Sequence, residues 1–270
     1  MEISVIGLSS IDNGIGSSDL KTGTEQLRFK QCASPAHGLT AVGDKFLAAS
    51  QLRNVSGSSG SIFFLSWNKP QAEVKSFPLE SITALAANME GTYIVGGGAS
   101  GDIFLWEVSS GKLLKKWHGH YQSVTCLLFS GDDSLLVSRS KDGYIRVWSL
   151  IRLFDDIQRQ QQGSTFYEHD FNEHTTSVTD IVIDYGGCNA LLVTASEDCT
   201  CKVRTCLEPV QGETVEKHHL SCSHQCTCVE FLQTSFFYAG NKDSKIYIGA
   251  MNSSSDYATQ APGSVSEQSL

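Results

Sequence analysis

Long apolar runs and basic clusters are both missing from this sequence of 270 residues. No apolar stretch approaches the roughly 18 residues that a membrane-spanning helix needs, so we expect no membrane span. The first residues, "MEISVIGLSS", place no basic group ahead of their short apolar stretch, so we expect no signal peptide. Lys and Arg form no run, and the net charge is -9. Tight, direct nucleic-acid binding is therefore disfavoured, and we expect nucleic acid to be contacted only indirectly.

The cysteines lack the spacing of a disulfide framework. There are nine of them, an odd number, and several lie inside strand-like runs such as "VTCLLF" and "TCKV". A reducing intracellular compartment fits this pattern best.

What the sequence does contain is a repeat. Its clearest copy, 118–150, has an alternating run, a "GDD" turn, the run "SLLVS", a "KDG" turn and the run "YIRVW". Related copies cover 37–67, 81–108, 176–203 and 236–251. The third runs end at Leu65, Trp106, Trp148, Arg204 and Gly249, at spacings of 41, 42, 56 and 45 residues.

Short strands in units of about 40 residues, with Gly-His before the first strand and Trp closing the third, resemble the WD-repeat β-propeller family. The resemblance implies an all-β propeller domain over 1–251 and a C-terminal tail over 252–270. About five blades are expected, near 36–67, 77–108, 118–149, 174–204 and 226–251. We expect the propeller to be truncated and incompletely closed, with a short helical insertion near 149–162.

Polar residues in the clearest copy match the hydrogen-bond network with which WD repeats lock a blade. They are His120, Asp142, Trp148 and one of two serines at the end of the second run, Ser138 or Ser140. Ser, His and Asp together could also indicate a hydrolase. However, an Asp in a "KDG" turn is expected to accept hydrogen bonds from turn amides, and no nucleophile elbow surrounds the serines. We therefore predict a structural network, no enzyme activity, no cofactor and no small-molecule substrate.

A glycine-rich stretch, "VGGGASGD" at 95–102, raises the alternative of a phosphate loop. It lacks the Lys-Ser/Thr pair of that motif, and it leads into a predicted strand where a phosphate loop leads into a helix. Nucleotide binding is therefore disfavoured.

The predicted helix of the insertion has an apolar side, formed by residues at helical spacing: Leu150, Leu153, Phe154 and Ile157. This side either packs on the rim of the propeller or binds a partner, because insertions in repeat folds often lie on the binding face. The two roles do not exclude each other.

The stretch from "GGGASGDIFLWEV" to "VWSLIRLFDDIQRQQ" resembles the WD-repeat subunits of the rixosome, whose plant members are called root initiation defective proteins. The Leu-Phe-Asp-Asp insertion directly after "VWSL" carries this resemblance. It implies a non-enzymatic nuclear scaffold bound to protein subunits of a ribosome-assembly complex. Its implied roles are pre-60S maturation with internal spacer processing, and assembly of pre-replicative complexes on chromatin. The alternative is a generic WD-repeat adaptor, such as a ubiquitin-ligase substrate receptor or a coat subunit.

Residues 218–228, "HHLSCSHQCTC", hold three histidines and three cysteines. One interpretation is a metal site in a Cys/His metalloprotein. Structural zinc sites usually show paired ligands two to four residues apart, whereas Cys226 and Cys228 alternate as in a strand. A second interpretation is a divergent blade in which cysteines act as small hydrophobic residues.

The third interpretation, which we favour, is a shifted reading frame over 204–235. "GETVEKHHL", written GGG GAA ACT GTT GAG AAA CAT CAT CTT, reads "GKLLRNII" one nucleotide later and resembles "GKLLKKW" at 111–117. "SHQCTC", written AGT CAT CAA TGC ACT TGC, becomes "VINALA" in the same frame and resembles "SITALA" at 81–86. The Cys/His cluster would then be an artefact, and no residue is predicted to bind metal.

Overall fold

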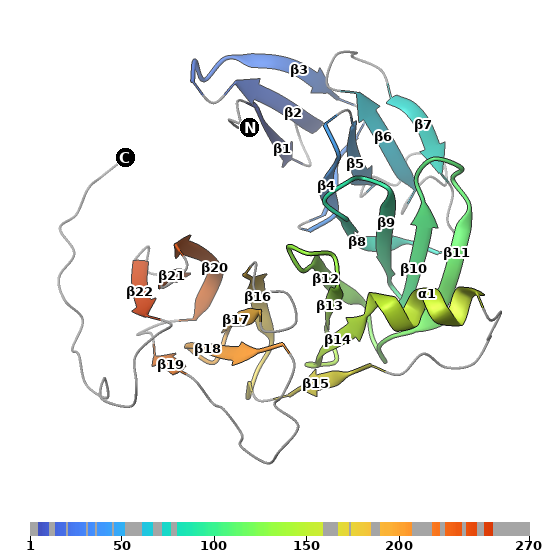
Figure 1. The fold of residues 1–270 in the computed structure, drawn as a ribbon. Coiled ribbons are helices and arrows are strands. Elements are labelled where there is room, and N and C mark those ends of the chain that lie inside the picture. The colour runs from blue at the N-terminus through green and yellow to red at the C-terminus, as the bar shows by residue number, and fades with distance from the viewer. Residues whose placement is uncertain are drawn as a thin grey trace. The chain divides into compact units, whose positions relative to one another are not determined.

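The computed structural model describes most of the chain, namely residues 5–10, 14–19, 21–30, 32–35, 37–44, 46–51, 61–66, 72–76, 80–158, 167–172, 174–184, 190–206, 218–221, 225–233, 236–241 and 246–250. These residues form six antiparallel sheets and one helix, shown in Figure 1. The chain divides into two units, which are described separately below.

The first unit begins with a three-stranded sheet of β1 (Val5–Ser10), β2 (Gly14–Asp19) and β3 (Glu25–Phe29). The second sheet contains β4 (Leu39–Val42), β5 (Phe46–Ser50), β6 (Ile62–Ser66) and β7 (Ala72–Ser76). The third contains β8 (Ile82–Ala87), β9 (Tyr93–Gly98), β10 (Asp102–Glu107) and β11 (Leu113–His118). The fourth contains β12 (Val124–Phe129), β13 (Leu135–Ser140), β14 (Ile145–Ser149) and β15 (His169–Phe171).

The second unit holds two sheets. One contains β16 (Val178–Ile183), β17 (Leu191–Ser196), β18 (Thr200–Thr205) and β19 (His218–Ser221). The other contains β20 (Cys226–Gln233), β21 (Phe236–Asn241) and β22 (Ile246–Ala250).

The prediction of an all-β chain with a short helical insertion is confirmed. Helix α1 (Leu150–Gln158) follows β14 directly, and the next described strand, β15, pairs antiparallel with β14. The insertion therefore lies between two strands of one sheet, and Arg152 of the helix reaches Glu168 at 3.1 Å. The β1–β3 sheet precedes the five predicted blades and was not predicted separately, because its strands lack the Gly-His and Trp signals of the later copies.

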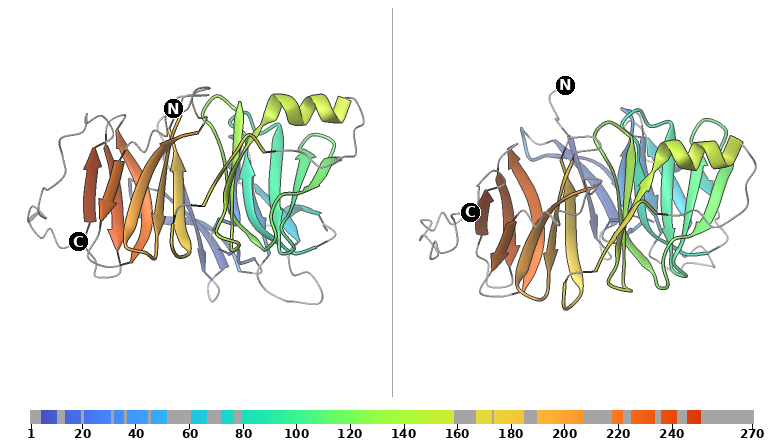
Figure 2. Two further views of the ribbon diagram at one scale, coloured as in Figure 1. Left: turned by 90° about the horizontal axis from the view of Figure 1, so that it is seen from below. Right: turned by 60° about the horizontal axis from the view of Figure 1, so that its bottom comes forward.

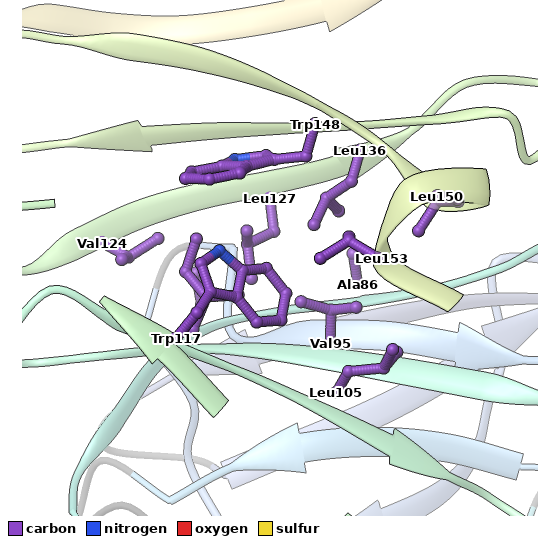
Figure 3. Packing of buried hydrophobic residues seen from close by; sticks show 12 residues of the cluster. Ala86, Val95, Leu105, Trp117, Val124, Leu127, Leu136, Trp148, Leu150 and Leu153 are labelled. Atoms are coloured by element: carbon purple, nitrogen blue, oxygen red, sulfur yellow. The ribbon is translucent and has the colours of Figure 1, made fainter. Parts of the chain in front are cut away.

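Alternation of side chains across each strand forms the core. In the first unit one cluster joins the β8–β11 and β12–β15 sheets and includes Val95, Leu105, Leu136 and Trp148. Figure 3 shows these side chains converging from neighbouring sheets, with Leu153 of α1 pointing in among them. Views of the same ribbon from other sides show α1 running across the strand ends of these sheets (Figure 2).

Candidate functional site

The predicted polar residues of the fourth sheet meet in one hydrogen-bond chain. The indole Nε1–H of Trp148 donates to Ser138 Oγ at 2.8 Å, and Ser138 Oγ lies 2.8 Å from His120 Nε2. On the other side of the ring, His120 Nδ1 lies 3.2 Å from Asp142 Oδ2. Since an ionised carboxylate can only accept, Nδ1 carries the proton, and Nε2 accepts from the Ser138 hydroxyl. This chain of hydrogen bonds therefore links β13 and β14 to the turn before β12.

The Asp142 carboxylate also organises the turns around it. It accepts from the backbone N–H of Tyr121 at 2.9 Å and from that of Tyr144 at 3.0 Å. Ser140 has a different partner: its hydroxyl donates to the Gln122 carbonyl at 2.9 Å and accepts from the Asp142 N–H at 3.2 Å. Of the two candidate serines, Ser138 therefore lies in the chain with His120, and Ser140 closes the neighbouring turn.

Burial decides the charge of His120. The side chain is fully buried, and removal from water lowers its pKa to about 4, although Asp142 opposes the shift. The imidazole is therefore neutral at pH 7, which the hydrogen-bond chain requires. Ser138 is also 0% exposed, so no substrate can reach its oxygen from solvent. This arrangement can lock a sheet but has no open position for a nucleophilic attack.

A second copy of this network lies in the β16–β19 sheet, and the sequence prediction missed it. His174 Nε2 lies 2.7 Å from Thr194 Oγ1, and its Nδ1 lies 3.0 Å from Asp198 Oδ2. Burial would raise the pKa of Asp198, but hydrogen bonds from Thr200 and His174 lower it to about 2. The spacing of His174 from Asp198 was the available signal. It was hidden because Arg204 occupies the strand position that Trp148 has in the fourth sheet.

The glycines of "VGGGASGD" serve close packing. A Cβ at Gly96 would lie 2.7 Å from Cζ3 of Trp106, and one at Gly97 would lie 2.4 Å from Val124 Cγ1. Larger residues would therefore push β9 away from its neighbours. The stretch leads into strand β10, which begins at Asp102, as the sequence predicted, and no helix N-terminus follows it.

The apolar side of α1 packs on the core of its own unit. Leu150 is 5% exposed, Leu153 is 0% exposed, and the ring centroid of Phe154 lies 4.9 Å from that of Tyr93. The packing alternative therefore describes these three side chains, and partner binding by the helix stays a prediction. The backbone of Ile157 lies in the helix, and its side chain is outside the described residues. The exposed side of α1 carries Ile151, at 71%.

Part of the Cys/His segment lies in strands. Residues 218–221 form β19, whereas 222–224 lie outside the described residues. Cys226 is fully buried in a cluster with Val193 and Val229, and its Sγ lies 3.6 Å from that of Cys201. Among the described residues no group of three Cys, His, Asp or Glu side chains is placed to hold a metal ion. The part of the chain that the structure describes also contains no helix long and apolar enough to cross a membrane.

Comparison with known proteins identifies the repeat. The family model "Vps8 beta-propeller" matches residues 71–154, and the model "WD domain, G-beta repeat" matches 165–204. A solved structure, the computationally designed Ika8 protein, is similar with a TM-score of 0.65 at 22% identity, over 93% of this chain and 69% of that one. At this identity the likeness concerns the fold alone.

Curated relatives are similar over long stretches. Protein ROOT INITIATION DEFECTIVE 3 of Arabidopsis thaliana is 68% identical over 268 residues, which cover 99% of this chain and 60% of the relative. WD repeat-containing protein 18 of Homo sapiens is 29% identical, over 84% of this chain and 50% of the relative. The pre-rRNA-processing protein IPI3 of Yarrowia lipolytica is 37% identical, over 51% of this chain and 31% of the relative.

The chain thus spans about 60% or less of the length of each of these relatives. The predicted WD-repeat β-propeller class and the predicted resemblance are both confirmed by these matches. The chain therefore has the WD-repeat β-propeller fold class and is similar in sequence to ROOT INITIATION DEFECTIVE 3, WD repeat-containing protein 18 and IPI3.

Proposed function

We propose that this chain is a non-catalytic scaffold in a rixosome-type complex that processes pre-rRNA in the nucleus. The observation that carries the proposal is its similarity to relatives named for pre-rRNA processing, at 37% identity for the Yarrowia lipolytica protein. The relative from Mycosarcoma maydis carries the same name and is 28% identical. The rRNA substrate and the other subunits of such a complex are part of this proposal.

The site described above supports a scaffold. The Ser, His and Asp side chains that could resemble a triad are buried and joined in a chain that ends on turn amides. Their hydrogen bonds hold neighbouring strands in place, so the surface around them is a rigid platform. A rigid platform suits protein partners, and rRNA is contacted through those partners because the chain itself has a net charge of -9.

Affinity purification from nuclear extract tests the proposal. The tagged chain is expected to recover the large subunits of a ribosome-assembly complex, identified by mass spectrometry. In cells depleted of the chain, unprocessed internal spacer pre-rRNA should accumulate, and re-expression should restore its processing. Recovery of no ribosome-assembly subunit, together with normal spacer processing after depletion, would overturn the proposal.

A role in assembling pre-replicative complexes on chromatin is a further part of this proposal. It rests on the resemblance of the insertion that follows "VWSL" and is tested by the same depletion. Loading of the replicative helicase onto chromatin in G1 should fall before spacer processing fails. Unchanged loading after complete depletion would remove this part and leave the scaffold function standing.

A further inference from the structure

An apolar groove lies between the β4–β7 and β8–β11 sheets of the first unit, beside their shared core, and has a volume of about 430 Å³. Aromatic and aliphatic side chains from both sheets line it, and residues 107–111 of the β10–β11 turn form its rim. Phe46, Phe64 and Val108 are partly exposed in it, whereas Trp106 is 9% exposed behind them. The groove therefore presents apolar surface that the described residues do not cover.

The next groove along the first unit, between the β8–β11 and β12–β15 sheets, is built from equivalent strand positions. Phe46 pairs with the last residue of β6 as Tyr93 pairs with the last residue of β10. By the same register Phe64 corresponds to Leu105. β5 and β6 therefore form a wall of the first groove that is equivalent to the wall that β9 and β10 form in the second.

The opposite walls correspond in the same way. Trp106 pairs with Ile94 across β10 and β9, and Trp148 pairs with Leu136 across β14 and β13. Two residues beyond each tryptophan lies Val108 in the first groove and Leu150 in the second. The two grooves therefore share a tryptophan wall and an aliphatic residue at the exit of the third strand.

The second groove is occupied by α1. Leu153 is completely buried in it, and Phe154 packs its ring against Tyr93 with centroids 4.9 Å apart (Figure 3 shows Leu153). Leu150 completes an apolar stripe at positions i, i+3 and i+4 of the helix. A groove of this shape therefore accepts one side of a short amphipathic helix.

The first groove has no comparable insertion of its own. In the second groove α1 follows the strand of Trp148, and the equivalent strand of the first groove is β10. This strand ends at Glu107 and β11 begins at Leu113, so five residues connect them, whereas α1 alone contains nine. An occupant helix therefore has to come from elsewhere. Among the lining residues Glu107 carries a charge, and the whole chain has a net charge of -9, so a basic helix is favoured.

We propose that this groove binds an amphipathic helix of a partner protein, with apolar residues at i, i+3 and i+4 and basic residues beside Glu107. Binding of a helix in an apolar groove is a common mode of protein recognition. This contact would give the proposed scaffold one specific docking site, and its test does not depend on ribosome assembly.

The probe is a fluorescein-labelled peptide that copies the helix in the second groove, residues 149–158, with Asp155→Lys and Asp156→Lys to supply the basic side. Its fluorescence anisotropy is measured against the full chain. We expect saturable binding that weakens at least tenfold with Val108→Glu, which places a charge on the groove wall. A peptide that also carries Leu153→Asp should not bind.

Two further variants keep the test independent of folding defects. Ser109→Arg changes an exposed rim residue, and it should weaken binding because it adds a positive charge and bulk at the groove mouth. Met89→Glu is the matched control, since Met89 is an apolar residue of the same sheet's turn that is 66% exposed away from the groove lining. Circular dichroism and thermal unfolding should show all three variants folded.

Each other outcome overturns the proposal. No binding to the wild-type chain, or equal binding to Val108→Glu and Ser109→Arg, would mean that the groove is not the binding site. A dimer in sedimentation that Val108→Glu dissociates would assign the groove to a second copy.

Failure of the proposed scaffold function can be distinguished from failure of the groove proposal. If the peptide binds as expected but the purified chain recovers no ribosome-assembly subunit, the groove proposal stands and the scaffold proposal fails. If the subunits are recovered equally by the wild type and by Ser109→Arg, and the peptide does not bind, the reverse holds.

Discussion

A single hydroxyl, that of Ser138, carries the direction of the hydrogen-bond chain in the fourth sheet. It accepts a hydrogen bond from the Trp148 N–H and donates one to His120 Nε2, so it uses one donor and one acceptor function. Protonation of His120 would turn Nε2 into a donor and set two donors against this oxygen. The stability of the sheet is thereby coupled to the protonation of one buried ring.

This coupling predicts a pH dependence. The pKa of His120 is about 4 in the folded chain and about 6.5 when unfolded, so the unfolded state binds the extra proton between these values. The contribution of His120 to the free energy of unfolding is fully present above about pH 6.5. It falls by up to about 3 kcal/mol as the pH drops toward 4. Urea unfolding of the wild type and of His120→Gln, measured from pH 7.5 to 4, should show that the variant lacks this slope.

His118→Gln is the matched control for that experiment, because the His118 side chain is 60% exposed and lies two residues away. His118 Nδ1 lies 3.0 Å from Asp102 Oδ1, so this variant should change the slope slightly, whereas His120→Gln should remove the part that belongs to the buried ring. A His120→Gln variant with an unchanged slope would assign the acid sensitivity to other groups.

Residue patterns predicted part of the site and not the rest. His120, Asp142 and Trp148 could be placed because the "KDG" turn and the closing Trp give their spacing. His174, Thr194 and Asp198 form the same contacts, but Thr replaces Ser and Arg204 replaces the Trp, so a search for the full pattern fails there. Hydrogen bonding depends on the presence of a hydroxyl and an imidazole at the right strand positions, which several residue types satisfy.

At the scale of elements, α1 has one structural side and one exposed side. Helical spacing predicted an apolar side correctly. The sequence alone did not identify the sheet on which this side packs, because that depends on the tertiary arrangement of the strands. The β8–β11 sheet, which ends before the insertion begins, supplies Tyr93 and Leu105. Deletion of the whole helix would therefore uncover the core and could not separate a partner contact from misfolding.

Point changes separate the two sides. Leu153→Ala should lower the free energy of unfolding by about 2–5 kcal/mol, because it leaves a cavity in a fully buried site. Ile151→Ala, on the exposed side of the same helix, should change it by less than about 0.5 kcal/mol. Denaturant unfolding measures both, and equal effects would contradict the packing of α1.

The shifted reading frame inferred for residues 204–235 can be tested by sequencing. If the shift is real, sequencing of the genomic locus and transcript across codons 195–270 should reveal an uninterrupted frame that encodes "GKLLRNII" and "VINALA". The Cys/His cluster would then disappear from the protein.

A transcript and peptides that match the printed sequence would contradict this expectation. The segment would then be a genuine part of the chain, with Cys226 packed as a small hydrophobic residue beside Cys201. Metal analysis of the purified chain is the next measurement in that case, and stoichiometric zinc would support the metal-site interpretation.

At the scale of the whole molecule, the net charge determines whether the protein binds RNA directly. With a net charge of -9 and no basic run, the chain should show no measurable binding to internal spacer RNA at about 150 mM salt. Electrophoretic mobility shift of a labelled spacer fragment with the purified chain tests this. An unrelated basic RNA-binding domain serves as the positive control, and a salt-sensitive shift with this chain would reveal a basic patch that its composition does not predict.

Both ends of the insertion that holds α1 are fixed in the same sheet, since β14 and β15 pair with each other. The register of that sheet is consequently independent of how many residues lie between the two strands, and the entropic cost of closing a loop grows only slowly with its length. The connection that follows α1 can therefore change in length while β14 and β15 keep their pairing, whereas the helix itself is held in place by its buried leucines.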